Sequence, residues 1–307
     1  MAWNPRRARA VRAVVWTAPL VLGMALARPA ATAPTSQPAA VAPVRGPTPS
    51  LALAEHVAAL KKKAPASFSV VVSPPFVVVG DAPAARLRAL AEGRIRWTAD
   101  RLRQEHFDRE LPEILTIWLF RNGASYRRYT RELFGETPTT PFGYYSARDR
   151  ALVMNIGSGG GTLVHELVHP YVAANFPACP AWLNEGLASL YEGATSRGAR
   201  IRGLVNWRLP GLQAAIRARR LPTFAQLLAT TDQEFYEEDP GTNYAQARFL
   251  CLYLQERGLL RRFFREARAA HGRDPGGVLT LRRVLGQPDL ERFQQAWEAW
   301  VLRLRQA

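Results

Sequence analysis

The chain has 307 residues, 48% hydrophobic and 21% charged, so it can bury a sizeable core in one large or two modest domains, and disorder throughout is excluded. Its formal charge of +16 favours anionic partners such as a cell-envelope surface. The same charge also fits a GC-rich genome, because only Lys61, Lys62 and Lys63 among 41 basic residues are lysines. No nucleic-acid partner is expected, because no arginine run is interleaved with aromatic residues in a recognised motif.

The N-terminus resembles an export signal. Residues 1–27 contain four arginines, no acidic residue and an apolar run from Ala13 to Ala27 that ends in small residues. This order predicts a secretory signal peptide cleaved near Ala27. The alternative is an uncleaved anchor, but the apolar run falls short of the roughly 20 residues that span a bilayer. We therefore expect a periplasmic, secreted or envelope-associated protein with a mature charge of +12 and no stable membrane span.

An Ala/Pro-rich segment, residues 28–50, predicts a disordered linker before an α+β part that covers residues 51–200. The elements expected there are helix 51–62, strands 68–72 and 76–80, helix 84–109, strand 113–120, helix 125–134 and a hairpin over 142–156. The strand at 113–120 is almost wholly apolar, which is typical of a strand covered on both faces. Residues 151–156, the second arm of the hairpin, are expected to be an edge strand.

Residues 201–307 are expected to form a helical C-terminal part that completes the same domain. The helices predicted there cover 211–219, 224–229, 243–270 and 289–306. Apolar residues in the last helix repeat in one stripe, which indicates a seam facing the core.

The chemistry is concentrated in the stretch from Gly159 to Gly193, "GGGTLVHELVHPYVAANFPACPAWLNEGLASLYEG". His165 and His169 are four residues apart, so on a helix their rings project from one face about 5–6 Å apart at Cβ. Glu166 lies beside them, and Glu185 is the natural third donor for a catalytic zinc, which takes three protein ligands. Composition predicts only about 0.004 chance occurrences of the His-Glu-any-any-His pattern.

"HELVH" followed by "PAWLNEGLASLYEG" resembles the gluzincin metallopeptidases of the peptidase MA-like group, and "WLNEGLA" is similar to the zinc-ligand segment of aminopeptidase N-type enzymes. The resemblance is strongest over residues 142–193. It implies a zincin-like core, a small mixed sheet with active-site helices, in which His165, His169 and Glu185 bind Zn²⁺. It also implies that Glu166 is the general base, and that Tyr244 is the donor to the oxyanion, with Tyr191 and Tyr171 as weaker options.

Two departures from these families affect the expectation. Pro170 follows the second histidine directly and disfavours helical geometry there, so the helix is expected to kink or stop at that point. No Gly-any-Met-Glu-Asn segment is present, so exopeptidase specificity is not carried over. The two cysteines, Cys179 and Cys251, allow either a disulfide or two buried thiols.

These patterns together predict an exported zinc metallopeptidase, an endopeptidase acting on peptide or protein substrates. One alternative is an envelope-binding or scaffold protein whose zinc is structural or lost. The intact Glu166 argues against it, because a structural site has no use for a base. A second alternative is the same zinc chemistry on a non-peptide amide, which the sequence does not separate from peptide hydrolysis.

Overall fold

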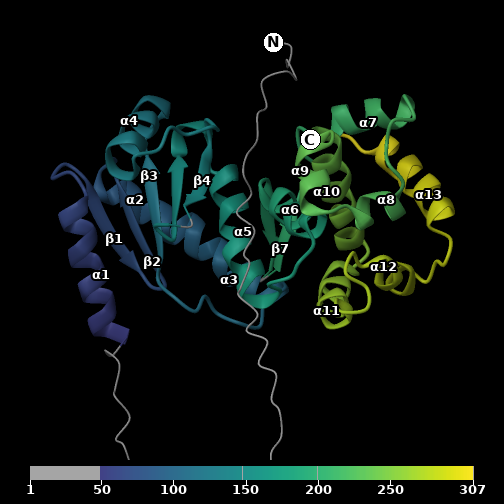
Figure 1. The fold of residues 1–307 in the computed structure, drawn as a ribbon, viewed down its shortest axis with the longest axis horizontal. Helices are drawn as coiled ribbons and strands as arrows, with labels where there is room; N and C mark the ends of the chain where they lie inside the picture. The colour runs from purple at the N-terminus through teal and green to yellow at the C-terminus, as the bar shows by residue number, and fades with distance from the viewer. Residues whose placement is uncertain (1–48, 147, 199, 307) are drawn as a thin grey trace, which may run out of the picture.

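A computed structural model describes residues 49–146, 148–198 and 200–306 (Figure 1). The expected signal peptide and most of the expected linker lie outside these residues. Helix α1 (Pro49–Lys63) takes up the last two positions of the linker region. A search of the described residues finds no helix that combines the length and the apolar character needed to cross a membrane.

Five strands form a mixed sheet in the order β1-β2-β3-β5-β4. The strands are β1 (Ser69–Ser73), β2 (Phe76–Gly80), β3 (Leu115–Phe120), β4 (Gly143–Ser146) and β5 (Ala151–Asn155). β2, β3 and β5 are parallel, and β1 and β4 are antiparallel to their neighbours. The predicted hairpin is present, but the prediction that its second arm is an edge strand is wrong. β5 lies between β3 and β4, and every one of its residues is buried, so β4 is the edge.

Side chains of β3 alternate between two hydrophobic clusters, one on each face of the sheet. Ile117 and Leu119 belong to the larger cluster, whereas Trp118 and Phe120 belong to the smaller one. All residues of this strand are buried, which confirms the prediction of a strand covered on both faces. The sheet is therefore the middle layer of the N-terminal half.

Helices cover both faces of the sheet. α1 and α4 (Gly123–Phe134) contribute to the smaller cluster, and α5 (Gly161–Asn175) contributes to the larger one. The helix expected over 84–109 consists of α2 (Ala84–Leu90), a π-helical turn η2 (Ala91–Arg96) and α3 (Trp97–Glu105). A short 3₁₀ turn, η3 (Ile156–Ser158), connects the sheet to α5.

The C-terminal half is helical, as expected, apart from a small hairpin of β6 (Ala194–Arg197) and β7 (Arg200–Gly203). Its helices follow α6 (Ala181–Tyr191) and are α7 (Leu209–Arg217), α8 (Phe224–Ala229), α9 (Asp232–Glu237), α10 (Pro240–Glu256), α11 (Leu260–Ala270), α12 (Val278–Leu285) and α13 (Leu290–Arg303). The prediction of a single helix over 243–270 is wrong, because α10 ends at Glu256 and α11 begins at Leu260. Gly258 lies between them with a φ of +69°, which ends the first helix. The hairpin, α9 and α12 were not predicted.

The stripe predicted in the last helix packs into the core. Phe293, Trp297 and Val301 of α13 are buried, and Trp297 Nε1 donates a hydrogen bond of 3.3 Å to the carbonyl of Phe249 in α10. Figure 1 shows the sheet on one side of the molecule and these helices on the other, with α5 and α6 between them. The observed class is α+β, with a small mixed sheet and a mainly helical C-terminal half.

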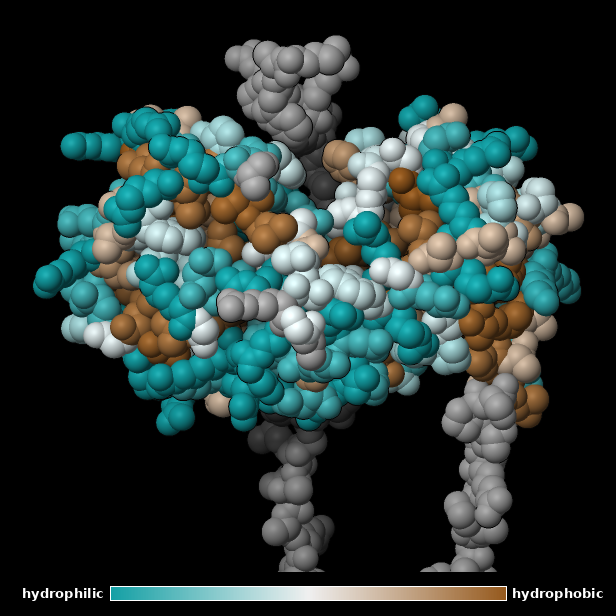
Figure 2. Space-filling view, turned by 180° about the vertical axis from the view of Figure 1, so that it is seen from behind, coloured by the Kyte–Doolittle hydropathy of each residue, from teal (hydrophilic) through white to brown (hydrophobic). Residues whose placement is uncertain are grey.

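Figure 2 shows the opposite face of the molecule. Hydrophilic side chains cover most of its lower middle, and hydrophobic side chains gather in patches to either side. The surface that joins the two halves on this face is therefore polar.

A buried histidine makes stability depend on pH. His106 is 3% exposed, and Nε2 lies 2.6 Å from the Tyr191 hydroxyl. Burial, with a smaller effect from the Arg261 charge, lowers the pKa of His106 to about 3. Because an unfolded histidine titrates near 6.5, the unfolded state binds the proton first, and stability is lost as pH falls from about 6.5 towards 3.

Between pH 7 and pH 4 the wild type should therefore lose about 3 kcal/mol more stability than His106→Gln, which carries no titrating ring at this position. Urea unfolding at both pH values measures the difference. His271→Gln is the control and should follow the wild type. Parallel pH profiles for the wild type and His106→Gln would contradict the prediction.

Candidate metal centre

Two histidines share one face of α5. The ring centroids of His165 and His169 are 5.0 Å apart, and the side chains are 12% and 22% exposed. Leu163, Leu167 and Val168 of the same helix are buried in the larger hydrophobic cluster and hold the helix in place. Spacing by four residues therefore places the two imidazoles side by side in a partly open position.

Glu185 reaches the histidines from α6, which packs against both α5 and α10. Oε2 of Glu185 lies 3.1 Å from Nε2 of His165, and Oε1 lies 3.9 Å from Nε2 of His169. One possible ligand atom from each of the three side chains falls within 4.8 Å of the other two. The structure thus brings together the three residues that the sequence proposes as metal ligands.

A glycine next to Glu185 allows the close packing of α6 on α10. A Cβ atom at Gly186 would lie 2.9 Å from Sγ of Cys251 and 3.0 Å from the carbonyl oxygen of Ala247. A larger residue would push α6 away from α10 and shift Glu185 with it. Both Cys179 and Cys251 are free thiols in the structure, but only Cys251 is buried and Cys179 is half-buried, so the alternative of two buried thiols holds in part.

Each histidine is also held through its second ring nitrogen. Nδ1 of His165 lies 3.0 Å from Oε1 of Glu192, and Nδ1 of His169 lies 2.9 Å from Oδ1 of Asn184. Glu192 in turn accepts hydrogen bonds from Arg208, one of them 3.0 Å long from Nη2. Such outer contacts fix the ring orientation and leave both Nε2 atoms directed at Glu185.

The electrostatics of the group favour a cation. Burial opposes a charge on His165, but the carboxylates of Glu185 and Glu192 outweigh it and raise the pKa of His165 to about 10. Burial likewise opposes the charge on Glu185, but His169 and His165 outweigh it and lower the pKa of Glu185 to about 2. A proton therefore binds among these groups in the metal-free protein, and a metal ion would replace it.

The donor set fits zinc. Two imidazole nitrogens and one carboxylate are a common ligand set for catalytic zinc. Oε2 of Glu185 is buried and receives no well-aligned hydrogen bond from any described residue, although Nε2 of His165 is close. A buried carboxylate oxygen without a donor is unfavourable, and a metal ion would satisfy it.

Glu166 lies between the two histidines on α5 and is half-buried. Burial raises the pKa of Tyr236 and Tyr244, and the negative charges of Glu185 and Glu166 raise it further. The negative charge of Glu166 therefore contributes to the electrostatic environment of both tyrosines. The helix does not stop at Pro170 as one expectation had it, but continues to Asn175.

Two tyrosines lie beside Glu185. Tyr244, the donor expected from the sequence, is half-buried near the start of α10. Its ring centroid is 6.3 Å from that of Tyr236, whose hydroxyl donates a hydrogen bond of 2.9 Å to Oε1 of Glu185. The weaker options lie elsewhere, because the Tyr191 hydroxyl contacts His106 and the Tyr171 ring stacks on Phe107 in the core.

Four further residues, none of them predicted from the sequence, contact the ligands directly or through a neighbour. They are Asn184, Glu192, Arg208 and Tyr236. One signal for Glu192 was available, because it stands seven residues after Glu185 and therefore on the same face of one helix. Tyr236 lies on α9, a helix of six residues that no periodic pattern reveals.

No family model matches the chain, and no curated protein matches it.

Proposed function

We propose that the protein is an exported, zinc-dependent endopeptidase of gluzincin type. His165, His169 and Glu185 would bind the zinc, and Glu166 would be the general base. The observation that supports this most is the convergence of the three donors within 4.8 Å on two packed helices. Catalytic zinc takes three protein ligands and keeps a fourth position open for water, and Glu166 directly follows the proposed ligand His165 in the sequence.

The arrangement of the sheet and helices also supports a zincin-like core. A five-stranded mixed sheet carries α5 on one face, and α6 packs on α5 with the third ligand. The helical half completes the site, since α9 and α10 contribute Tyr236 and Tyr244. Export is proposed from residues 1–27 alone.

The residues have separate roles in hydrolysis. When bound, zinc supplies a Lewis acid that polarises the scissile carbonyl and lowers the pKa of water towards about 7. Glu166 takes the proton of the attacking water and passes it to the leaving amine nitrogen. Tyr244 donates a hydrogen bond to the oxygen on which negative charge develops.

The substrate would bind along the sheet. β4 is an edge strand of the sheet and pairs with β5 alone among the described strands, and an extended peptide would add to this edge as a further strand. α5 contacts β4, which places this edge beside the helix that carries the histidines. A substrate added as a further strand would therefore cross the metal centre.

Metal analysis of the purified protein tests the assignment. The wild type should contain about one zinc ion per chain, and His165→Ala should lose it because two donors do not hold a catalytic zinc. His271→Ala is the matched control and should retain the metal. Unchanged zinc in His165→Ala would remove these residues as ligands.

A peptide-library digest of the same samples separates the functions. Zinc together with peptide cleavage supports the peptidase. Zinc without cleavage of any peptide favours an envelope scaffold, and cleavage restricted to other amides favours the same chemistry on a different substrate.

A further inference from the structure

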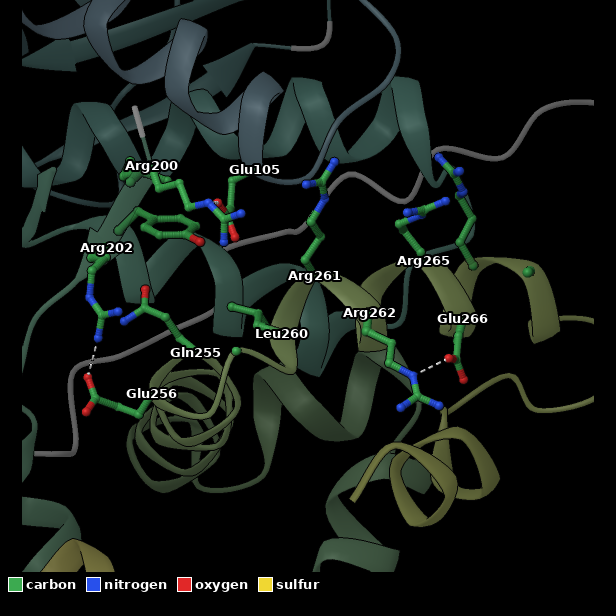
Figure 3. Close-up of a pocket in the computed structure, with 15 residues that line it drawn as sticks. Glu105, Arg200, Arg202, Gln255, Glu256, Leu260, Arg261, Arg262, Arg265 and Glu266 are labelled. Carbon is green, nitrogen blue, oxygen red and sulfur yellow. Dashed lines mark hydrogen bonds and ion pairs between the residues drawn. The ribbon is translucent and has the colours of Figure 1, made fainter. Parts of the chain in front are cut away.

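A second polar site lies away from the metal centre. An open pocket of about 1050 Å³ is lined by α3, β7, the end of α10 and most of the length of α11, and none of the proposed metal ligands lines it (Figure 3). Six of its lining residues are arginines: Arg200, Arg202, Arg261, Arg262, Arg265 and Arg268. Only three are acidic, Glu105, Glu256 and Glu266. The pocket therefore has an excess of positive charge.

Four of the arginines have acidic partners. The pairs are Arg200–Glu105 at 3.8 Å, Arg202–Glu256 at 2.9 Å, Arg262–Glu266 at 2.6 Å and Arg268–Asp108 at 3.2 Å. Arg261 and Arg265 form no ion pair or hydrogen bond with any residue that the structure describes. Figure 3 shows Arg262 turned towards Glu266, while Arg261 and Arg265 project to the other side of α11.

The two unpaired arginines repel each other. Arg261 and Arg265 are four residues apart on α11, so their charges lie on one face, and both side chains are exposed. Like charges at this spacing destabilise a helix. A ligand with closely spaced negative groups would remove this repulsion and form bidentate contacts with both guanidinium groups.

The other residues that line the pocket indicate which class of anionic ligand fits it. Tyr191 is the one aromatic residue of the pocket, and it is 1% exposed with its hydroxyl against His106, so no ring is available to stack a base. Oε2 of Glu105 is buried and accepts no hydrogen bond from the described residues. The backbone of a peptide offers N–H groups for such an acceptor beside carboxylates for the arginines, whereas the phosphate groups of a nucleic-acid backbone offer only acceptors.

We propose that this arginine pocket binds an acidic segment of a polypeptide. The pocket is joined to the metal centre through consecutive residues of the chain, since Tyr191 lines the pocket and Glu192 holds His165. The segment would then belong to a protein substrate, at a distance from the scissile bond. This last step rests on the proposed function, whereas binding of the peptide does not.

Fluorescence anisotropy tests the binding directly. A short labelled peptide of alternating Glu and Ala is titrated with the full chain carrying Glu166→Gln, so that hydrolysis does not interfere. Adding Arg261→Glu and Arg265→Glu should weaken binding by about ten-fold or more, because two attractive contacts become repulsive. Arg261→Gln with Arg265→Gln should give a smaller loss, and circular dichroism checks that both variants are folded.

α4 supplies a matched control. Arg127 and Arg131 are also exposed, four residues apart on one helix, and form no ion pair with the described residues. Arg127→Glu with Arg131→Glu makes the same change in net charge and should leave the affinity within about two-fold. An equal loss in this control would overturn the proposal, because attraction to net charge would then explain the binding.

Two further results test the arginine pocket and the proposed peptidase function independently. Tighter binding of an oligonucleotide than of a peptide of equal charge would show that the pocket binds phosphate and would overturn the proposal. Peptide binding that depends on Arg261 and Arg265 in a protein without zinc or hydrolysis would support the pocket and contradict only the proposed function.

Discussion

Glu166→Gln should reduce peptide hydrolysis by about 10²–10⁴-fold while the zinc content stays the same. Glutamine keeps the shape of the side chain but does not accept a proton from the attacking water. Glu166 is also not among the three side chains that offer ligand atoms to the metal, so the site should still form. The loss should therefore fall on turnover, with little change in the amount of metal bound.

The measurement compares initial rates on a peptide that the wild type cleaves with zinc measured on the same samples. Glu55→Gln is the matched control, because Glu55 is an exposed residue of α1 on the other face of the sheet. It should keep both activity and zinc. Full activity in Glu166→Gln would show that another group is the base. A wild type that binds zinc but cleaves nothing, with the variant behaving alike, would instead favour the scaffold.

This variant is more informative than a ligand replacement. Removing His165 takes away a partner of both the buried Glu185 at 3.1 Å and the half-buried Glu192 at 3.0 Å. Leaving such groups without a partner destabilises the surrounding structure. Loss of activity in His165→Ala therefore reports on folding and on metal together, whereas Glu166→Gln changes one proton acceptor.

The parts of the fold that the sequence predicts well are those set by local patterns. The apolar run of β3 and the stripe in α13 depend on residues close together in the chain, and both pack as predicted. The i,i+4 spacing of His165 and His169 is also local, since one helix fixes it. The third ligand needed more than spacing, because contact between α5 and α6 brings it close.

The wrong predictions of secondary structure and strand order have two sources: contacts between residues far apart in the chain, and local signals that were misread. Which arm of the hairpin pairs with β3 depends on tertiary packing, although the uninterrupted apolar run of residues 151–154 is typical of an interior strand. Gly258 inside the predicted helix 243–270 was a stop signal that the apolar periodicity obscured. The hairpin of β6 and β7 has strands of only four residues, too short for a period to be recognised.

Tyr236 and Tyr244 should affect different steps. Tyr236 donates its hydrogen bond of 2.9 Å to Oε1 of Glu185, so its hydroxyl orients a ligand. Tyr236→Phe should therefore weaken zinc binding by about 10–100-fold, as loss of an outer contact to a ligand does. With zinc in excess, turnover should recover.

Tyr244→Phe should lower turnover by about 10²–10³-fold with zinc affinity nearly unchanged, because the hydroxyl is proposed to act only on the oxyanion. Zinc titration and steady-state rates at saturating zinc separate the two effects. Tyr253→Phe, another tyrosine of α10 that packs on Phe293 rather than near Glu185, is the control and should change neither value. A turnover defect in Tyr236→Phe that excess zinc does not correct, beside normal turnover in Tyr244→Phe, would exchange the two roles. The donor to the oxyanion would then come from α9, the helix that the sequence did not reveal.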